Sequence, residues 1–158
     1  MTWDQREESA FCDRARWGHG QWAEEPDKIE WRHKGIPCLI VRNPLAGNLC
    51  GYVGLPPGHP AYGGDWEHPL LADVNVHGGV TFGSRCQENG GHICHVARPG
   101  EPEDVWWVGF DCAHCDDRCP RDEPRHTWNG YPASYRDVDY VRRQTESLAD
   151  QLLAMGAG

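Results

Sequence analysis

The stretch DCAHCDDRCP at 111–120 concentrates side chains that can bind metals or transfer protons. It holds Cys112, Cys115 and Cys119 in the spacing CxxCxxxC. A CxxC turn can bring two thiolates to one tetrahedral ion, and thiolates and imidazoles are the ligands that zinc prefers. The spacing therefore predicts a zinc site.

The three cysteines need a fourth ligand, which we expect from the sequence just before them. Cys94 and His95 could supply it, as could Cys86. The ending CxxxCP also resembles half of an iron–sulfur cluster run, but the further CxxC step of that run is missing, which favours zinc. The alternative is that the cysteines are buried thiols, because free cysteine is among the most buried residue types.

Histidines and aspartates near the same stretch could perform acid–base chemistry. His77 precedes a Gly-Gly pair, whose lack of side chains leaves room for a ligand, and His114 follows an apolar run. Asp111 and Asp117 could each orient a ligating imidazole or act as a general base on a metal-bound water. These four residues are the predicted catalytic set, which requires the Gly-Gly turn and the end of the apolar run to converge.

Two other interpretations of these residues stay open. In the first, Cys112 is a nucleophile activated by His77 or His114. Asp111 then orients the activating histidine. In the second, each histidine is a structural cap and each aspartate belongs to a solvated acidic loop.

Short apolar runs separated by Gly, Pro and Asn indicate an antiparallel sheet over residues 34–112. Two pairs of runs are predicted as hairpins, one across NPLAGN and one across the Gly-Gly pair. The predicted strands are 37–41, 49–53, 74–77, 80–82, 92–97 and 105–110.

Side chains alternate between the two faces of a strand, so the residues from the run at 105–110 onward can be assigned to opposite faces of the sheet. Trp106, Val108, Phe110 and Cys112 should share one face, and Trp107 should lie on the other.

The two ends of the chain differ from its middle. Apolar residues recur at three or four positions from Tyr135 to Leu152, which predicts an amphipathic helix over 134–154 with Ser134 as its N-cap. Residues 1–33 carry tryptophans among charges, and we expect an irregular aromatic arm laid over the core.

Length and composition indicate the fold class. At 158 residues, the chain is expected to form a single domain over 1–158. Its 19 glycines and 12 prolines suit short strands and many loops, not a helical bundle. We predict an α+β fold: a mainly antiparallel twisted sheet of about five or six strands with the C-terminal helix across one face.

The charge excludes some classes of partner. Fifteen Lys and Arg against 24 Asp and Glu give a net charge of −9, and the acidic residues are scattered. Nucleic acids and anionic membranes attract basic patches, so we expect neither as a partner. The charged N-terminal region lacks the apolar core of a signal peptide, so the cytoplasm is the expected location. In that reducing compartment the eight cysteines are expected as thiols, ligands or nucleophiles, not as disulfides.

Several long motifs resemble those of a family of small uncharacterised proteins encoded by bacteriophages and prophages. They include LCGYVGLPPGHP at 49–60, VHGGVTF at 76–82 and ICHVARPGEPEDVWWVGFDCAH at 93–114. The resemblance implies a phage-type accessory protein that acts in the cytoplasm of a bacterial host. Family members resemble GFDCAHxGD, which Cys115 and Cys119 do not match. The resemblance therefore favours a site built without these two cysteines.

Two functions follow from the sequence. In the first, the Cys, His and Asp residues form a site at a sheet edge that binds a small molecule, as a zinc-dependent hydrolase or binder. In the second, zinc or the thiols only stabilise the fold, and the protein binds and modulates a host protein. Neither the substrate nor the oligomeric state follows from the sequence.

Overall fold

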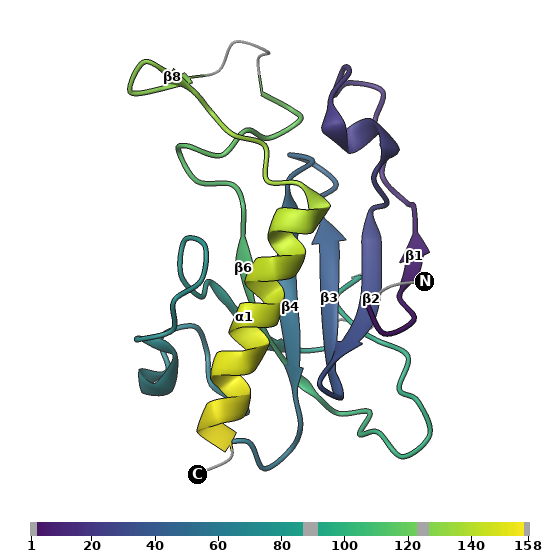
Figure 1. Ribbon diagram of the computed structural model, residues 1–158, viewed down its shortest axis with the longest axis vertical. Coiled ribbons are helices and arrows are strands. Elements are labelled where there is room, and N and C mark those ends of the chain that lie inside the picture. Colours follow the sequence, from purple (N-terminus) through teal and green to yellow (C-terminus); the bar gives the residue numbers. More distant parts are fainter. Residues whose placement is uncertain (1–2, 87–91, 123–126, 157–158) are drawn as a thin grey trace.

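The computed structural model describes residues 3–86, 92–122 and 127–156. Six strands form one antiparallel sheet in the order β1-β2-β3-β4-β6-β5, and Figure 1 shows the helix α1 lying across one face, over β4 and β3. The α+β class predicted from the sequence is confirmed. The strands of the sheet are β1 (Glu7–Ser9), β2 (Lys28–His33), β3 (Ile36–Arg42), β4 (Leu49–Leu55), β5 (Phe82–Arg85) and β6 (Trp106–Asp111). The other elements are η1 (Gln21–Glu24), η2 (Pro69–Leu71), the small pair β7 (Thr127–Trp128) and β8 (Tyr131–Pro132), and α1 (Val138–Gly156).

The centre of the sheet is the hairpin predicted across NPLAGN. β3 and β4 pair from Arg42 opposite Leu49 to Cys38 opposite Val53. Both strands are buried along their whole length, because each of their faces is covered. β6 then pairs with the far side of β4.

The N-terminal region is more regular than predicted. β1 and β2 lie within residues 1–33, which the sequence analysis assigned to an irregular arm. Ile29 and Trp31 of β2 are buried, and a two-residue turn at Lys34 and Gly35 connects β2 to β3. Both turn residues have positive φ, 52° and 81°, as the tightest hairpin turns require. The alternation in KIEWRH was the signal for this strand.

Two predicted strands, 74–77 and 92–97, are not strands in the structure, so the hairpin predicted across Gly78-Gly79 does not form. The strand predicted at 80–82 is instead β5, at Phe82–Arg85, which pairs with β6. In segments 74–77 and 92–97, backbone groups bond to side chains of other elements, and no ladder to a neighbouring strand is formed there. The amides of Asn75 and His77 donate to Gln151 and Gln144 of α1, each at 2.9 Å. Segment 92–97 is likewise bonded by side chains, in this case by those of β2.

α1 packs closely on the sheet. A side chain at Gly51 of β4 would place its Cβ 2.3 Å from Thr145 Oγ1, so only glycine lets the helix approach this near. The helix begins at Val138 rather than near Ser134, because Asp137 is its cap: the Tyr140 amide donates to Asp137 Oδ1 at 2.9 Å. Among the described residues, no helix is long and apolar enough to cross a membrane.

The two faces of the sheet carry separate apolar clusters. The larger cluster lies under α1 and contains Val108, Phe110 and Cys112, while Trp107 belongs to the smaller cluster on the other face. This is the alternation predicted for the tryptophan-led strand. The segment before β6 covers the smaller cluster, with Cys86 and Ile93 packed against it. The sheet is therefore enclosed by a helix on one side and a loop layer on the other.

A buried polar network joins the N-terminal region, β3 and the start of α1. Arg42 is fully buried, and its guanidinium bonds to Asp27 Oδ1 at 3.0 Å and to the Tyr135 hydroxyl at 2.8 Å. The Tyr135 hydroxyl donates to Glu25 Oε1 at 2.5 Å, and the Val138 amide donates to Glu25 Oε2 at 2.7 Å. These opposite charges compensate one another where burial removes them from solvent.

Candidate functional site

Two loops bring His77, His114 and Asp117 together beside the first turns of α1. His77 lies in the loop between η2 and β5, and the other two residues follow β6. His77 Nε2 is 2.9 Å from Asp117 Oδ2, and His114 Nδ1 is 3.2 Å from the same oxygen. One ligand atom of each residue lies within 4.8 Å of the others, close enough to hold one metal ion. The Gly-Gly turn and the end of β6 thus converge, as the sequence analysis required.

Neighbouring side chains also form hydrogen bonds with the atoms of His77 and Asp117 that face away from the centre of the cluster. Tyr140 OH lies 2.7 Å from His77 Nδ1, the ring nitrogen that faces away from Asp117. Arg136 Nε donates to Asp117 Oδ1 at 2.8 Å, which leaves Oδ2 to the histidines. The His77 amide is fixed in turn by Gln144. Tyr140, Arg136 and Gln144 were not among the predicted site residues, because only the packing of the C-terminal region brings them to the two histidine loops.

Asp117 is ionised in this setting. Only 1% of the residue is exposed, and burial by itself would raise the pKa of its carboxyl. Hydrogen bonds from His77, from Arg136 and from the His114 amide outweigh burial and lower the pKa below its ordinary value of 3.8. The site therefore offers a permanent negative charge between two imidazoles at neutral pH.

The cluster opens to solvent on the His114 side. The His114 side chain is 35% exposed, whereas that of His77 is 10% exposed. Asp111 stands at the rim, where its Oδ1 is 3.8 Å from His114 Nδ1 and its Oδ2 accepts from the Thr81 hydroxyl at 3.1 Å. Asp111 is thus placed beside the cluster and is not one of its three grouped residues.

Gly78 shapes the pocket for the His114 ring. Its φ is +68°, and an added Cβ would lie 2.1 Å from His114 Cε1. The neighbouring Gly79 also has a positive φ of +79°, but nothing lies within 4 Å of the place its Cβ would take. The first glycine therefore provides both the turn and the space, and the second only the turn.

The CxxCxxxC cysteines do not assemble into a ligand group. Cys112 and Cys119 are buried, whereas Cys115 is exposed. Cys112 continues the alternation of β6 and enters the core under α1, and the turn that follows sends Cys115 outward. Burial raises the pKa of the Cys112 thiol, and it raises that of Cys119 to about 11. A protonated buried thiol is a poor ligand and a poor nucleophile, so the structure favours neither prediction for Cys112.

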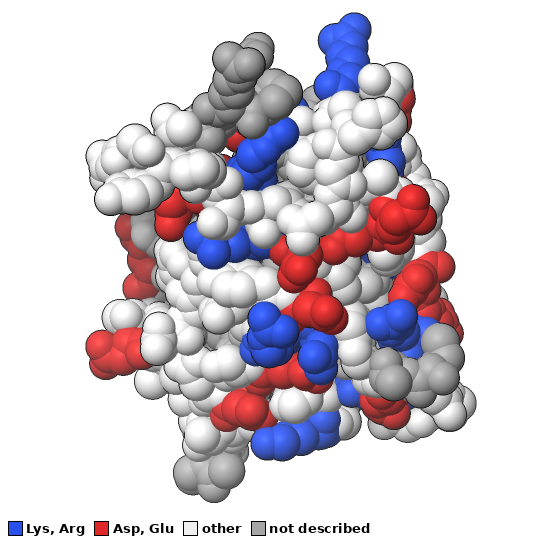
Figure 2. Space-filling view, turned by 45° about the horizontal axis from the view of Figure 1, so that its top comes forward, with Lys and Arg blue, Asp and Glu red and all other residues white. Residues whose placement is uncertain are grey.

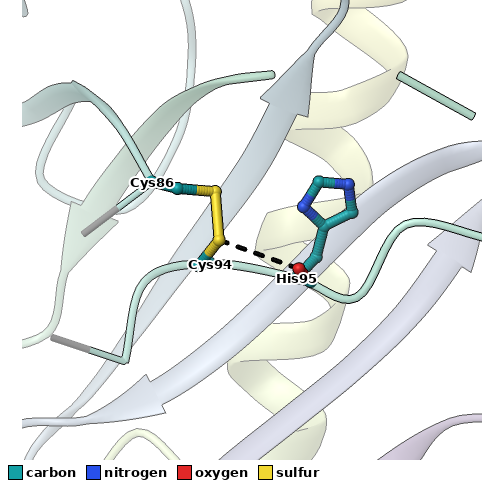
Figure 3. A group of neighbouring side chains, drawn as sticks. All are labelled: Cys86, Cys94 and His95. Atoms are coloured by element: carbon teal, nitrogen blue, oxygen red, sulfur yellow. Dashed lines mark hydrogen bonds between the residues drawn. A yellow bond between two sulfur atoms is a disulfide. The ribbon is translucent and has the colours of Figure 1, made fainter. Parts of the chain in front are cut away.

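The remaining predicted metal ligands, Cys94 and His95, lie on the face of the sheet away from α1. They are grouped with Cys86, and Cys86 and Cys94 form a disulfide (Figure 3). The expectation that the cysteines are thiols, metal ligands or nucleophiles rather than disulfides is therefore wrong for this pair. The free cysteines are Cys12, Cys38, Cys50, Cys112, Cys115 and Cys119.

A cavity of about 560 Å³ lies away from the histidine cluster. Its walls include Pro37, Pro56 and Leu153, at the end of β4 opposite to the one that pairs with Asp111. The histidine cluster therefore does not line this cavity. Over the face seen in Figure 2, Lys and Arg are interspersed with Asp and Glu and do not form one continuous basic patch.

No protein-family model, curated protein or solved structure gives a significant match to this chain. The resemblance to phage-encoded proteins therefore stays a prediction from the sequence, and the function has to be argued from the geometry of the site.

Proposed function

We propose that the protein binds one zinc ion through His77, His114 and Asp117 and uses it to hydrolyse a small molecule. The observation that carries this proposal is the grouping of three ligand atoms within 4.8 Å of one another. The hydrogen bonds of Tyr140 and Arg136 to the outer atoms support it. Metal-binding histidines and carboxylates usually have such partners, which fix the orientation of the ligand.

The donor set favours zinc over the common hard cations. Two imidazole nitrogens and one carboxylate suit zinc, whereas calcium and magnesium prefer oxygen ligands alone. Catalytic zinc sites commonly have three protein ligands and a water in the fourth position. The exposed side of His114 is where that water and a substrate would enter.

A zinc ion held by His77, His114 and Asp117 would supply the nucleophile, because zinc would lower the pKa of a coordinated water to about 7. Asp111, at the rim of the cluster, is placed to accept a proton from a water on this side. With the family resemblance, this makes the chain a phage-type accessory hydrolase of the bacterial cytoplasm.

The test is the zinc content of the whole chain with its disulfide formed, together with hydrolysis of p-nitrophenyl acetate as a probe. We expect one zinc per chain by elemental analysis, and hydrolysis that a chelator abolishes and added zinc restores. A chain that takes up no zinc from a micromolar zinc buffer would refute the metal site. Zinc uptake without chelator-sensitive hydrolysis would refute the hydrolytic role.

The two adjacent glycines offer a matched pair of variants for the same site. We expect Gly78→Ala to weaken zinc binding by about 10–100-fold, because its Cβ displaces the His114 ring and misplaced ligands cost affinity on that scale. Gly79→Ala carries a similar backbone strain at positive φ and should leave zinc affinity unchanged. The dissociation constants are measured by competition with a chromogenic chelator. Equal losses in the two variants would mean that backbone strain, not the position of His114, controls binding.

A further inference from the structure

Cys86, Cys94 and His95 form a second group of potential metal ligands. Figure 3 shows the two cysteines joined sulfur to sulfur, with the imidazole of His95 standing beside them. The two sulfurs and a ring nitrogen of His95 lie within 4.8 Å of one another. The group lies on the face of the sheet away from α1 and shares no residue with the histidine cluster.

The ring nitrogens of the half-buried His95 side chain are poorly satisfied. Both nitrogens are shielded from solvent, and neither makes a well-aligned hydrogen bond among the described residues, although the Pro102 backbone lies close to the ring. Buried polar side-chain atoms are bonded in the large majority of cases, so an exception asks for an explanation. A metal ion bound at one of these nitrogens would supply the missing interaction.

The surroundings suit thiolate sulfur. Trp107 Nε1 donates to Cys86 Sγ at 3.3 Å, and such a hydrogen bond stabilises negative charge on sulfur. The Lys28 ammonium donates to the carbonyl oxygen of Cys94 at 2.8 Å, which places a positive charge next to this residue. The rings of His95 and Trp107 meet edge to face with centroids 5.3 Å apart, so the imidazole is held beside the sulfurs.

We propose that Cys86, Cys94 and His95 form a zinc site that opens and closes with the redox state of the two cysteines. In the reduced protein, two thiolates and the imidazole bind one zinc ion. In the oxidised protein, the disulfide described here removes two of the three ligands and the ion leaves. Zinc accepts this set of sulfur and nitrogen ligands, whereas a disulfide is not a thiolate donor.

The oxidant is a low-molecular-weight disulfide such as glutathione disulfide. One cysteine thiolate attacks it, forming a mixed disulfide and releasing one small thiolate. The second cysteine thiolate then attacks the mixed disulfide, forms the Cys86–Cys94 bond and releases the second small thiolate. The two protein sulfurs lose two electrons, the small disulfide gains them, and the zinc ion is released.

The experiment compares zinc stoichiometry in the reduced and the oxidised protein. The full chain is reduced or treated with glutathione disulfide, equilibrated with zinc, freed of unbound metal and analysed. We expect one more zinc per chain in the reduced state. The same difference is expected in a His114→Ala background, where the first proposed site is disabled. A failure of the first proposal changes the totals in the wild type, whereas a failure of the second removes the difference.

Variants assign the difference to this group. Cys86→Ser and His95→Ala should each abolish it, while Cys115→Ser, at an exposed free cysteine, should keep it. In wild type, zinc should protect Cys86 and Cys94 of the reduced chain from alkylation, a readout that needs no variant to fold. Cobalt added to the reduced chain should give the thiolate charge-transfer absorption. Equal zinc in both redox states, or a difference that survives Cys86→Ser, would overturn the proposal.

Discussion

Replacing Asp27 by alanine is expected to lower the free energy of unfolding by about 3–5 kcal/mol, the range for breaking a buried ion pair from one side. The Asp27 side chain is fully buried and bonds to Arg42 Nε at 3.0 Å. The Arg14 guanidinium donates to the same oxygen, Oδ1, and Oδ2 accepts from the amides of Phe11 and Cys12 at 2.7 and 2.8 Å. The variant leaves a buried guanidinium and two amides without their acceptor, and chemical denaturation measures the loss.

The control for this variant is Asp73→Ala, at an exposed aspartate, where the change should stay within about 0.5 kcal/mol.

The pH dependence of the free energy of unfolding tests the role of Asp27 a second time. Burial raises the pKa of Asp27, but hydrogen bonds from Cys12, Phe11 and Arg14 outweigh it and lower the pKa below 3.8. Its contribution is therefore complete above pH 3.8 and is lost as the pH falls through the lower folded-state pKa. Equal stabilities of Asp27→Ala and wild type at neutral pH would contradict the role assigned to the network.

Removing one imidazole from the proposed zinc site is expected to weaken zinc binding by more than about 100-fold, beyond the 10–100-fold that loss of an outer partner costs. His114→Ala is the cleaner variant, because this side chain is 35% exposed and its loss leaves the core intact. Tyr140→Phe removes only the hydroxyl that lies 2.7 Å from His77 Nδ1, so its effect should fall within the smaller range. Competition with a chromogenic chelator, on the oxidised protein, measures each constant.

The order of the losses in zinc affinity among these variants tests whether the ion binds at the proposed site. His19→Ala, at an exposed histidine far along the chain from both loops, should bind zinc as wild type does. The variants should retain the circular dichroism of wild type. If His114→Ala keeps the wild-type affinity, or if Tyr140→Phe costs more than His114→Ala, then the ion does not sit where we place it.

The spacing of apolar residues and the turn residues were sufficient to predict the elements whose form depends on neighbouring residues in the sequence. The hairpin of β3 and β4, the alternating faces of β6 and the amphipathic α1 all follow from side-chain period and turn residues. β2 was missed although Ile29 and Trp31 alternate, because charged residues separate them and the Lys34-Gly35 turn lacks the usual asparagine.

The two predicted strands that failed share one physical cause. Segment 74–77 alternates like a strand, but its amides are bonded by Gln144 and Gln151 of α1. In segment 92–97, the Val96 amide donates to Glu30 Oε1 at 3.3 Å, and the Lys28 ammonium donates to the Cys94 carbonyl. Side chains distant in sequence thus replace a neighbouring strand as hydrogen-bond partners, and the pattern of apolar residues gives no sign of this.

Only part of the candidate site could be predicted, because local sequence marks loops but not the direction of each side chain. His77, His114 and Asp117 could be chosen because a glycine pair and a strand end mark their loops. The metal-like spacing of Cys112, Cys115 and Cys119 was misleading, since the period of β6 directs the first thiol into the core and the following turn directs the second outward. Spacing indicates which ligands can meet, but the direction of each side chain decides whether they do.

The bonds from α1 to His77 also impose an order on biosynthesis. The ribosome releases all six strands of the sheet before it releases residues 138–156, which contain Tyr140 and Gln144. A nascent chain with a finished sheet therefore exposes His77 on an untethered loop. At the proposed zinc site, the bonds from Tyr140 and Gln144 that orient His77 therefore form only after residues 138–156 have been synthesised.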